Sequence, residues 1–352
     1  MKTAKSYLAL LAVLLVLLVQ SGCAAQTTNS PPPATRTVVD MAGKTVKIPA
    51  EVNRIVVTCY GGASNEIAVL NAGDKIIAQP TMKSFKQLEI MEPKFKETPD
   101  VGSFDNVNVE EILKLKPDIV VASVTSPTGN KKLADAGIPV VTVLTGKATV
   151  DGLKKEFTMM GEVLHKEKEA AALVQLWNGK LQMLQERVAK IPSDQVKTVY
   201  YMLGKPLHTE GSANWGQSLI TAVGGKNAAQ GIGNVKDISV EQLLQWNPDV
   251  IILSSNEGQF ISPDDLKKNP QMGNLKALKN SQTYQCPIGA FWWDRPSPES
   301  VLGFMWLAKT LYPDTFADVN LEQETKDFYQ TFYHYSLSSQ ELQAFFNPQA
   351  SA

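Results

Sequence analysis

The stretch VEEILKLKPDIVVAS, residues 109–123, decides the fold because the chain uses it twice. The second copy, VEQLLQWNPDVIILS, occupies residues 240–254. In each copy a short amphipathic helix ends at Pro-Asp, because proline disfavours helical geometry in the preceding residue and cannot donate to the helix ladder. Four apolar residues and a serine follow, which is typical of a strand buried in a parallel sheet. The identical positions are Val109/Val240, Glu110/Glu241, Leu113/Leu244, Pro117/Pro248, Asp118/Asp249 and Ser123/Ser254.

One helix-to-strand unit used twice predicts two similar α/β lobes. Residues 36–148 form the predicted N-terminal lobe, which begins with a β-hairpin about Ala42-Gly43. Residues 192–352 form the predicted C-terminal lobe and end in a helix within 323–346, where aromatic residues recur at helical spacing.

Residues 149–191 join the two lobes and have a helical period, with Lys and Glu opposite the apolar positions. The second of two helices predicted here, residues 166–189, would be about 35 Å long and could reach from one lobe to the other. The predicted fold is therefore two Rossmann-like lobes with mainly parallel sheets, joined by one long rigid helix, with a ligand cleft between the lobes. The alternative is an ordinary helix that covers the sheet of one lobe.

The front of the chain predicts export. Residues 1–23 contain two lysines, a short apolar run and small residues before Cys23, which describe a signal peptide. The pattern resembles the lipobox of bacterial lipoproteins, which implies that Cys23 is lipidated after cleavage and anchors the chain to the membrane. An uncleaved anchor helix is the alternative, but the apolar run is short of the ~20 residues that span a bilayer. Residues 24–35 are polar and rich in proline, as in a flexible tether.

Charge and cysteine content exclude some classes of protein. A net charge of −1 over 352 residues argues against a nucleic-acid binder, which would carry a basic excess or patch. Apart from Cys23 the chain has Cys59 and Cys286, which fall in different predicted lobes. We therefore expect two separate buried thiols and no disulfide.

Candidate ligand-binding residues follow from the rule that ligands bind beyond the carboxyl ends of parallel strands. The loops predicted there are rich in aromatic residues, and rings suit a bulky, partly flat ligand, while Asp294 and Arg295 add charge. The alternative is that the run 291–293 packs its own loop down. The candidates are Tyr60, Phe104, His208, Trp215, Trp292, Trp293, Asp294 and Arg295.

Catalysis and a bare metal site find little support. The chain lacks Gly-x-Ser-x-Gly, His-Glu-x-x-His, Cys-x-x-Cys and Gly-x-Gly-x-x-Gly. Of its three histidines, His165 and His334 are predicted to be solvated, and only His208 lies beside the predicted cleft. A transition metal wants two or three His or Cys ligands together, so we predict no metal ligands and no cofactor. A metal wrapped in an organic chelator needs no such cluster.

Five short motifs follow one another along the chain: DMAGK at 40–44, LNAGDKI at 70–76, KPD at 116–118, GGKNA at 224–228 and NPD at 247–249. In this order they resemble the motifs of the substrate-binding lipoproteins of ABC importers for iron-siderophores, haem and cobalamin. The resemblance implies a permease and its ATPase as partners. It also implies docking through one acidic residue on each lobe, which Glu66 matches on the first. The second-lobe helix has Thr221 near that place, and Glu210 or Glu241 could substitute.

We predict a monomeric, non-enzymatic protein that captures a metal chelate outside the cytoplasmic membrane. A ferric siderophore ranks first, a corrinoid second, haem third and an oxyanion fourth. The oxyanion stays open because WDRPSPE at 293–299 and WLAK at 306–309 resemble a branch with molybdate and tungstate binders. Backbone N–H groups, Ser hydroxyls and Arg295 would hold it. A two-lobed α/β enzyme and an adhesin or scaffold are the rivals.

Overall fold

The computed structural model describes residues 34–60, 62–254 and 261–348. The predictions for the signal peptide, the tether and Cys23 concern residues that lie outside these ranges. From Thr35 onward the chain forms one compact unit. Within the described residues, every helix is either too short or too polar to cross a bilayer.

The first half contains a four-stranded, fully parallel sheet in the order β4-β3-β7-β8. It is preceded by the predicted hairpin, β1 (Thr35–Val39) with β2 (Thr45–Pro49). Two short strands, β5 (Gly102–Ser103) and β6 (Asn106–Val107), form a separate hairpin. The sheet strands are β3 (Ile55–Val57), β4 (Ile76–Ala78), β7 (Ile119–Ser123) and β8 (Val140–Val143). The helices are α2 (Ala63–Val69), α3 (Lys86–Met91), α4 (Val109–Leu115) and α5 (Pro127–Asp135).

The second half contains a mainly parallel sheet in the order β12-β10-β9-β13-β14, with β11 also paired to β9. The short strands β10 and β12 are antiparallel, whereas β9, β11, β13 and β14 run parallel. The strands are β9 (Thr198–Leu203), β10 (His208–Thr209), β11 (Lys226–Asn227), β12 (Lys236–Asp237), β13 (Val250–Ser254) and β14 (Thr283–Gln285). The helices are α8 (Trp215–Ala222), α9 (Val240–Trp246), α10 (Pro263–Lys268), α11 (Lys276–Lys279) and α12 (Ser300–Leu311).

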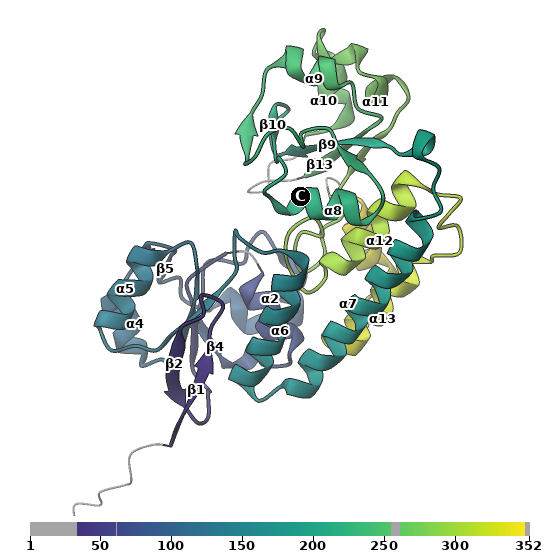
Figure 1. Cartoon of the computed structure of the whole chain (residues 1–352). Coiled ribbons are helices and arrows are strands. Elements are labelled where there is room, and N and C mark those ends of the chain that lie inside the picture. Colours follow the sequence, from purple (N-terminus) through teal and green to yellow (C-terminus); the bar gives the residue numbers. More distant parts are fainter. Residues whose placement is uncertain (1–33, 61, 255–260, 349–352) are drawn as a thin grey trace, which may run out of the picture. The chain divides into compact units, whose positions relative to one another are not determined.

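Two helices link the halves, α6 (Val150–Leu164) and α7 (Glu167–Val188) (Figure 1). They are separated at His165, whose left-handed backbone (φ 56°) ends α6. Helix α7 packs on α6 and also on α8 and α12. The ring of Trp177 is fully buried between Phe157 of α6, at 5.9 Å, and Phe304 of α12, at 5.8 Å. One continuous apolar core therefore runs from the first sheet through α6 and α7 to α12.

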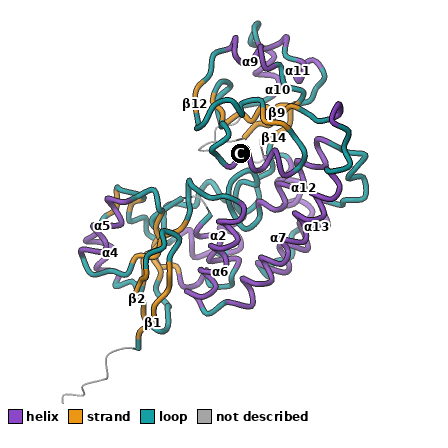
Figure 2. Tube along the Cα trace, viewed as in Figure 1, coloured by secondary structure: helices purple, strands orange, loops and turns teal. Residues whose placement is uncertain are grey.

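The α/β prediction with two mainly parallel sheets is confirmed, and the alternation of strand and helix can be followed along the trace in Figure 2. The C-terminal segment differs from the single helix predicted within 323–346. It forms two helices, α13 (Leu321–Phe332) and α14 (Ser339–Phe346). His334 takes a left-handed backbone (φ 52°), and Ser338 opens a new helix by a capping box with Glu341. The aromatic spacing continued across this break and so concealed it.

Candidate functional site

The candidate site is built around the loop between β14 and α12, residues 286–299. The loop lies at the carboxyl end of the second sheet, where parallel strands present their ligands. Its backbone folds back on itself, because Ile288 pairs with Trp292 in a bridge and the N–H of Gly289 donates to the carbonyl of Phe291 at 2.9 Å. Hydrogen bonds within the loop therefore fix the backbone that carries Trp292 and Arg295.

Arg295 is the central charge of this site. Its guanidinium donates to the hydroxyl of Tyr201, which lies on β9, and Nη1 is 3.4 Å from Oδ2 of Asp294. It also stacks over the ring of Trp292, with 5.9 Å from Cζ to the ring centroid. Burial opposes its charge, but Tyr201, Asp294 and Glu210 outweigh burial and raise the pKa of Arg295. A positive charge is thus held firmly in place, and 20% of the side chain stays exposed.

Glu210 and Asp294 supply the carboxylates near this cation. Oε2 of Glu210 accepts from the N–H of Gly216, in the first turn of α8, at 2.7 Å. Burial is the largest influence on Glu210 and raises the pKa of its carboxyl, against the effect of Arg295. Asp294 is 1% exposed, and its Oδ2 has no hydrogen-bond donor beyond the ion pair. The site can therefore offer a fixed guanidinium, a carboxylate and a carboxyl that protonates readily.

Several of the predicted ligand-binding rings are packed away from solvent. Trp293 and Phe291 are 0% and 2% exposed, which agrees with the alternative that this run packs its own loop down. Trp215 is 5% exposed and packs edge-on against Phe304, at 5.7 Å between ring centroids. Among the aromatic candidates of the second half, Trp215 and Trp293 are buried and Trp292 is half-buried. The aromatic surface left for a flat ligand is smaller than the sequence suggested.

The first half contributes a second wall to this loop. Phe85, just before α3, packs its ring on Phe291 and Trp292, with centroid distances of 4.7 and 4.9 Å. Gly62 caps α2 with φ 91°, and a Cβ there would come within 2.9 Å of the carbonyl of Pro296. The loop is therefore clamped by both halves, and glycine is required where α2 meets it.

Tyr60, Phe104 and His208 are each half-buried. Tyr60 follows β3, and Phe104 is tied to the same strand end by its N–H, which donates to the carbonyl of Thr58 at 2.7 Å. Nδ1 of His208 lies 2.5 Å from Oδ1 of Asp237, so this ring is paired with a carboxylate. Within the described part of the chain, no three His, Cys, Asp or Glu side chains gather as a metal would need.

Glu66, the predicted docking residue of the first half, lies inside the protein. It is 2% exposed, and burial together with the carboxyl of Glu156 raises the pKa of Glu66. Burial also raises the pKa of Glu156 to about 7, although the N–H of Leu144 donates to it. In this conformation Glu66 presents no exposed carboxylate to an arginine of a permease. Glu241, the second-half candidate, is exposed at the start of α9.

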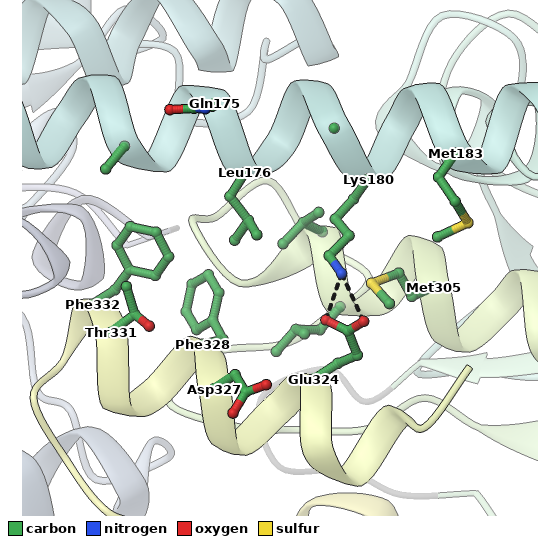
Figure 3. Close-up of a pocket in the computed structure, with 14 residues that line it drawn as sticks. Gln175, Leu176, Lys180, Met183, Met305, Glu324, Asp327, Phe328, Thr331 and Phe332 are labelled. Atoms are coloured by element: carbon green, nitrogen blue, oxygen red, sulfur yellow. Dashed lines mark hydrogen bonds and ion pairs between the residues drawn. The ribbon is translucent and has the colours of Figure 1, made fainter. Parts of the chain in front are cut away.

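A separate pocket of about 540 Å³ lies behind the connecting helix, between α7, α12 and α13 (Figure 3). Its lining is mostly apolar. Nζ of Lys180 on α7 forms an ion pair with Oε2 of Glu324 on α13 at 2.6 Å. The floor residues Val301, Leu302 and Met305 are at most 2% exposed. The pocket therefore has little accessible floor, and we interpret it as the packed seam where α13 is fastened to α7.

Tyr201, Glu210 and Phe85 are not among the predicted ligand-binding residues. Tyr201 sits in a run of buried residues in β9, where no pattern separates it from core. Glu210 was considered only for docking. The signal that could have found it is its place in a loop followed by a helix, because the first N–H groups of a helix attract a carboxylate.

Comparison with known proteins identifies the family. Residues 56–288 match the family model described as "Periplasmic binding protein". The chain belongs to the periplasmic binding protein family. Proteins of this family serve as the substrate-binding components of ABC importers, and the chain is a member of that class.

Several relatives of this periplasmic binding protein carry names that state a ligand, among them the following two. The molybdate-binding protein MolA of Haemophilus influenzae is 31% identical over 329 residues, which covers 86% of this chain and 92% of the relative. The Fe(3+)-citrate-binding protein of Bacillus subtilis is 27% identical and covers 77% and 86%. Molybdate and Fe(3+)-citrate are the ligands that the names of these two relatives state.

Solved structures agree with the fold of this periplasmic binding protein. A periplasmic solute binding protein of Veillonella parvula has a TM-score of 0.79 at 31% identity, covering 90% of this chain and 98% of that one. The structure of MolA of Haemophilus influenzae bound to molybdate has a TM-score of 0.76 at 29% identity, covering 86% and 99%. Their architecture supports the two-lobed α/β fold.

Proposed function

We propose that this protein is a non-enzymatic, monomeric lipoprotein that captures a solute outside the cytoplasmic membrane and hands it to an ABC permease and its ATPase. Membership of the periplasmic binding protein family supports the binding role. The export signal supports the location, with Cys23 as the lipid anchor. No cofactor takes part. Glu241 supports docking on the second half because its carboxylate is exposed.

We propose further that the ligand is a small oxyanion of the molybdate and tungstate class. The observation that carries this is Arg295, whose guanidinium is held by Tyr201 and Asp294 and whose side chain is 20% exposed. A guanidinium fork matches the oxygens of an oxyanion. Among the residues that the structure describes, the buried donors without a partner include the Ser297 hydroxyl on the same loop and the indole N–H of Trp215 on α8. The similarity to MolA supports the same ligand class.

A ferric chelate is the second candidate. Sequence reasoning ranked a ferric siderophore first because it expected many exposed rings. Burial of Trp293, Phe291 and Trp215 removes most of that argument and moves the oxyanion ahead. Trp292, Tyr60 and Phe104 are half-buried, however, and could still contact a flat chelate. The iron-citrate relative favours this candidate as well.

The deciding experiment is a calorimetric titration of the mature chain, from residue 24 onward. The ligands are molybdate, tungstate, sulfate, ferric citrate, a ferric hydroxamate siderophore, cobalamin and haem. We expect molybdate and tungstate to bind and to be recovered unchanged. Sulfate is a smaller oxyanion of equal charge, so it tests whether size matters as well as charge. Binding of a chelate alone would refute the oxyanion and restore the siderophore. Turnover of any ligand would refute the binding role.

The connecting helix adds a test of mechanism. Because α7 packs on both α6 and α12, we predict only a small hinge motion when ligand binds. Solution scattering of the free and the molybdate-saturated protein should give nearly equal radii of gyration. A large compaction would contradict the rigid connection.

A further inference from the structure

Glu299, at the start of α12, has a carboxyl with no exposed surface. Oε2 accepts from the indole N–H of Trp293 at 3.0 Å and from the hydroxyl of Tyr329 at 2.8 Å. Oε1 accepts more weakly from the hydroxyl of Tyr333 at 3.4 Å. A carboxylate is retained in such a place only when donors surround it, because an unpaired buried charge is very costly.

The binding loop is wrapped closely around this carboxyl. A Cβ added to Gly289 would come within 2.3 Å of Oε2 of Glu299 and 2.4 Å of the hydroxyl of Tyr329. The N–H of Ala290 donates to the same hydroxyl at 2.6 Å. The backbone of the loop is thus in direct contact with Glu299 and its partner, and Trp292 and Arg295 follow within a few residues.

The network continues into the first half of the molecule. The hydroxyl of Tyr333, which donates to Glu299, accepts from Nδ2 of Asn65 at 3.2 Å. Asn65 lies in α2, whose first residue follows the Gly62 that touches the loop at Pro296. Glu299 therefore joins the loop, the C-terminal helix α13 and a helix of the opposite half through hydrogen bonds alone.

We propose that Glu299 is a positioning residue for ligand binding: its carboxylate holds loop 288–295 through Trp293 and Tyr329, so ligand affinity depends on whether Glu299 is ionised. The part that concerns ligand affinity rests on the proposed binding function. Glu299 touches no ligand in this scheme. It acts through the position of Trp292 and Arg295.

Glu299 changes its charge state near neutral pH. Burial raises the pKa of Glu299 to about 7, although Tyr329, Trp293 and the N–H groups of Ala290 and Phe291 stabilise the carboxylate. The titratable groups that face it are Tyr329 and Tyr333, and burial raises the pKa of both well above 10. Both phenols stay neutral near pH 7, so Glu299 is the member of the network that titrates there. On protonation one carboxyl oxygen becomes a donor, and one of the three donors loses its acceptor.

The direction of the effect follows from this loss. We expect affinity to fall as the pH falls through 7, by about tenfold between pH 8 and pH 6, the typical effect of losing one hydrogen bond to a charged group. Glu299→Gln should bind more weakly at pH 8 and should lose most of this pH dependence. Protonation of Glu210, beside Arg295, is common to both proteins, so the difference between their pH profiles isolates Glu299.

Two measurements test the proposal. The first is the affinity for molybdate, with ferric citrate as a second probe, from pH 5.5 to 8.5. The second needs no ligand, because the indole of Trp293 is bonded to Glu299 and tryptophan fluorescence should titrate with a midpoint near pH 7. Glu341→Gln is the matched control. Glu341 also accepts from a tyrosine, Tyr335 at 2.6 Å, but its pKa is lowered by its partners and it should leave both profiles unchanged.

Tyr333→Phe removes a single hydroxyl, so it is a milder second variant that can be measured if Glu299→Gln misfolds. It should weaken binding less than Glu299→Gln and shift the fluorescence midpoint. A Glu299→Gln protein that keeps the wild-type fluorescence titration overturns the proposal, as does one that keeps the wild-type affinity profile. If neither probe binds the wild type, the proposed ligand fails, while the ligand-free titration still decides whether Glu299 sets the position of the loop.

Discussion

The two copies of the helix-to-strand unit share a side-chain cap, a left-handed helix end and an aspartate bonded to the backbone of the neighbouring strand. Asn108 caps α4 by accepting from the N–H of Glu111 at 3.2 Å, and Ser239 caps α9 by accepting from Gln242 at 3.1 Å. Both helices end in a left-handed residue before Pro-Asp. The aspartates, Asp118 and Asp249, then accept backbone N–H groups at the start of the neighbouring strand. Each copy therefore contains the contacts that begin its helix, end it and attach its strand to the sheet.

The two halves differ in the charged groups near the carboxyl ends of their strands. In the first half Glu66 and Glu156 are buried together with no basic residue in an ion pair with either, among the residues described. In the second half the buried carboxyls of Glu210 and Asp294 surround Arg295. The residues proposed to hold the ligand, Arg295 and its partners Tyr201, Asp294 and Glu210, all lie outside the repeated stretch. The repeated stretch therefore supplies scaffold, and the proposed ligand-binding groups come from other segments.

The largest expected effect is the loss of the cation in the second half. Arg295→Met leaves Asp294 and Glu210 buried without it, so we expect molybdate affinity to fall at least ~100-fold and the free energy of unfolding to fall by about 3–5 kcal/mol. Calorimetry and urea unfolding measure the two effects. Arg187→Met is the control, because Arg187 pairs with exposed Asp318 far from the loop and should change neither much. Retained affinity in Arg295→Met would place the ligand elsewhere.

The second effect concerns the two acids of the first half. Both carboxyls have raised pKa values, so between about pH 4.5 and pH 7 the folded state binds more protons than the unfolded state. Stability must then fall as the pH rises through this window, and it levels off only above the folded-state pKa values of both acids. For Glu156, a pKa of about 7 against 4.5 corresponds to about 3 kcal/mol at most.

Glu66→Gln removes one of the two acids and should reduce that loss. Urea unfolding at pH 5, 6, 7 and 8 measures it, with the variant more stable than wild type at pH 8. Glu241→Gln, an exposed acid on the second half, should keep the wild-type pH dependence. An unchanged slope in Glu66→Gln would mean that the two acids do not titrate against one another.

The third test compares Asp118 with Asp249 directly. Asp118→Ala leaves the N–H groups of Asn53 and Arg54 without their acceptor, and Asp249→Ala leaves that of Thr198. Each change should lower the free energy of unfolding by about 1–3 kcal/mol. Burial would raise the pKa of Asp249, but its bonds to Lys276 and Thr198 prevail and lower it. Its contribution is therefore present above the unfolded pKa of about 3.8 and lost as the pH falls below that. A cost at only one of the two sites would show that the copies are not equivalent scaffolds.

The smallest expected effect is a difference in stability between changes at the C-terminal ends of α4 and α9. Lys116 has φ 49° and Asn247 has φ 39°, a backbone that favours glycine. Lys116→Gly should stabilise the protein by about 0.5–1 kcal/mol in thermal unfolding. Asn247→Gly should gain less or nothing, because Oδ1 of Asn247 also accepts from the N–H of Lys276 at 2.9 Å. Equal gains at both positions would show that this bond contributes nothing.

Much of the fold could be predicted because local chemistry decides it. The Pro-Asp breaks, the apolar runs and the hairpin turn at Gly43 act over a few residues, and β7, β13 and the first hairpin lie where these signals placed them. The break after α13 was missed because the signal for it, the left-handed His334 followed by the Ser338 capping box, is weaker than the continuing aromatic period.

The site was harder to predict because burial depends on partners far away in the sequence. Trp292 and Trp293 are neighbours of the same type, yet one stays half-buried while the other is fully enclosed by its bond to Glu299 and its packing on Phe346. Glu66 matched a docking motif, but Glu156, 90 positions later, shares its buried environment. A one-dimensional pattern contains no information about such pairings.

The two thiols have a practical use. Cys59 and Cys286 were expected to stay unpaired, and both are free and buried. Burial raises the pKa of Cys59 to about 12 and that of Cys286 well above its usual value, so almost none of either is thiolate at neutral pH. A cysteine introduced at exposed Ser212, three residues before α8, should react with a maleimide dye far faster than either. The mature chain, with residue 23 omitted, could thus become a single-label optical sensor for its solute without removal of any native cysteine from the folded body.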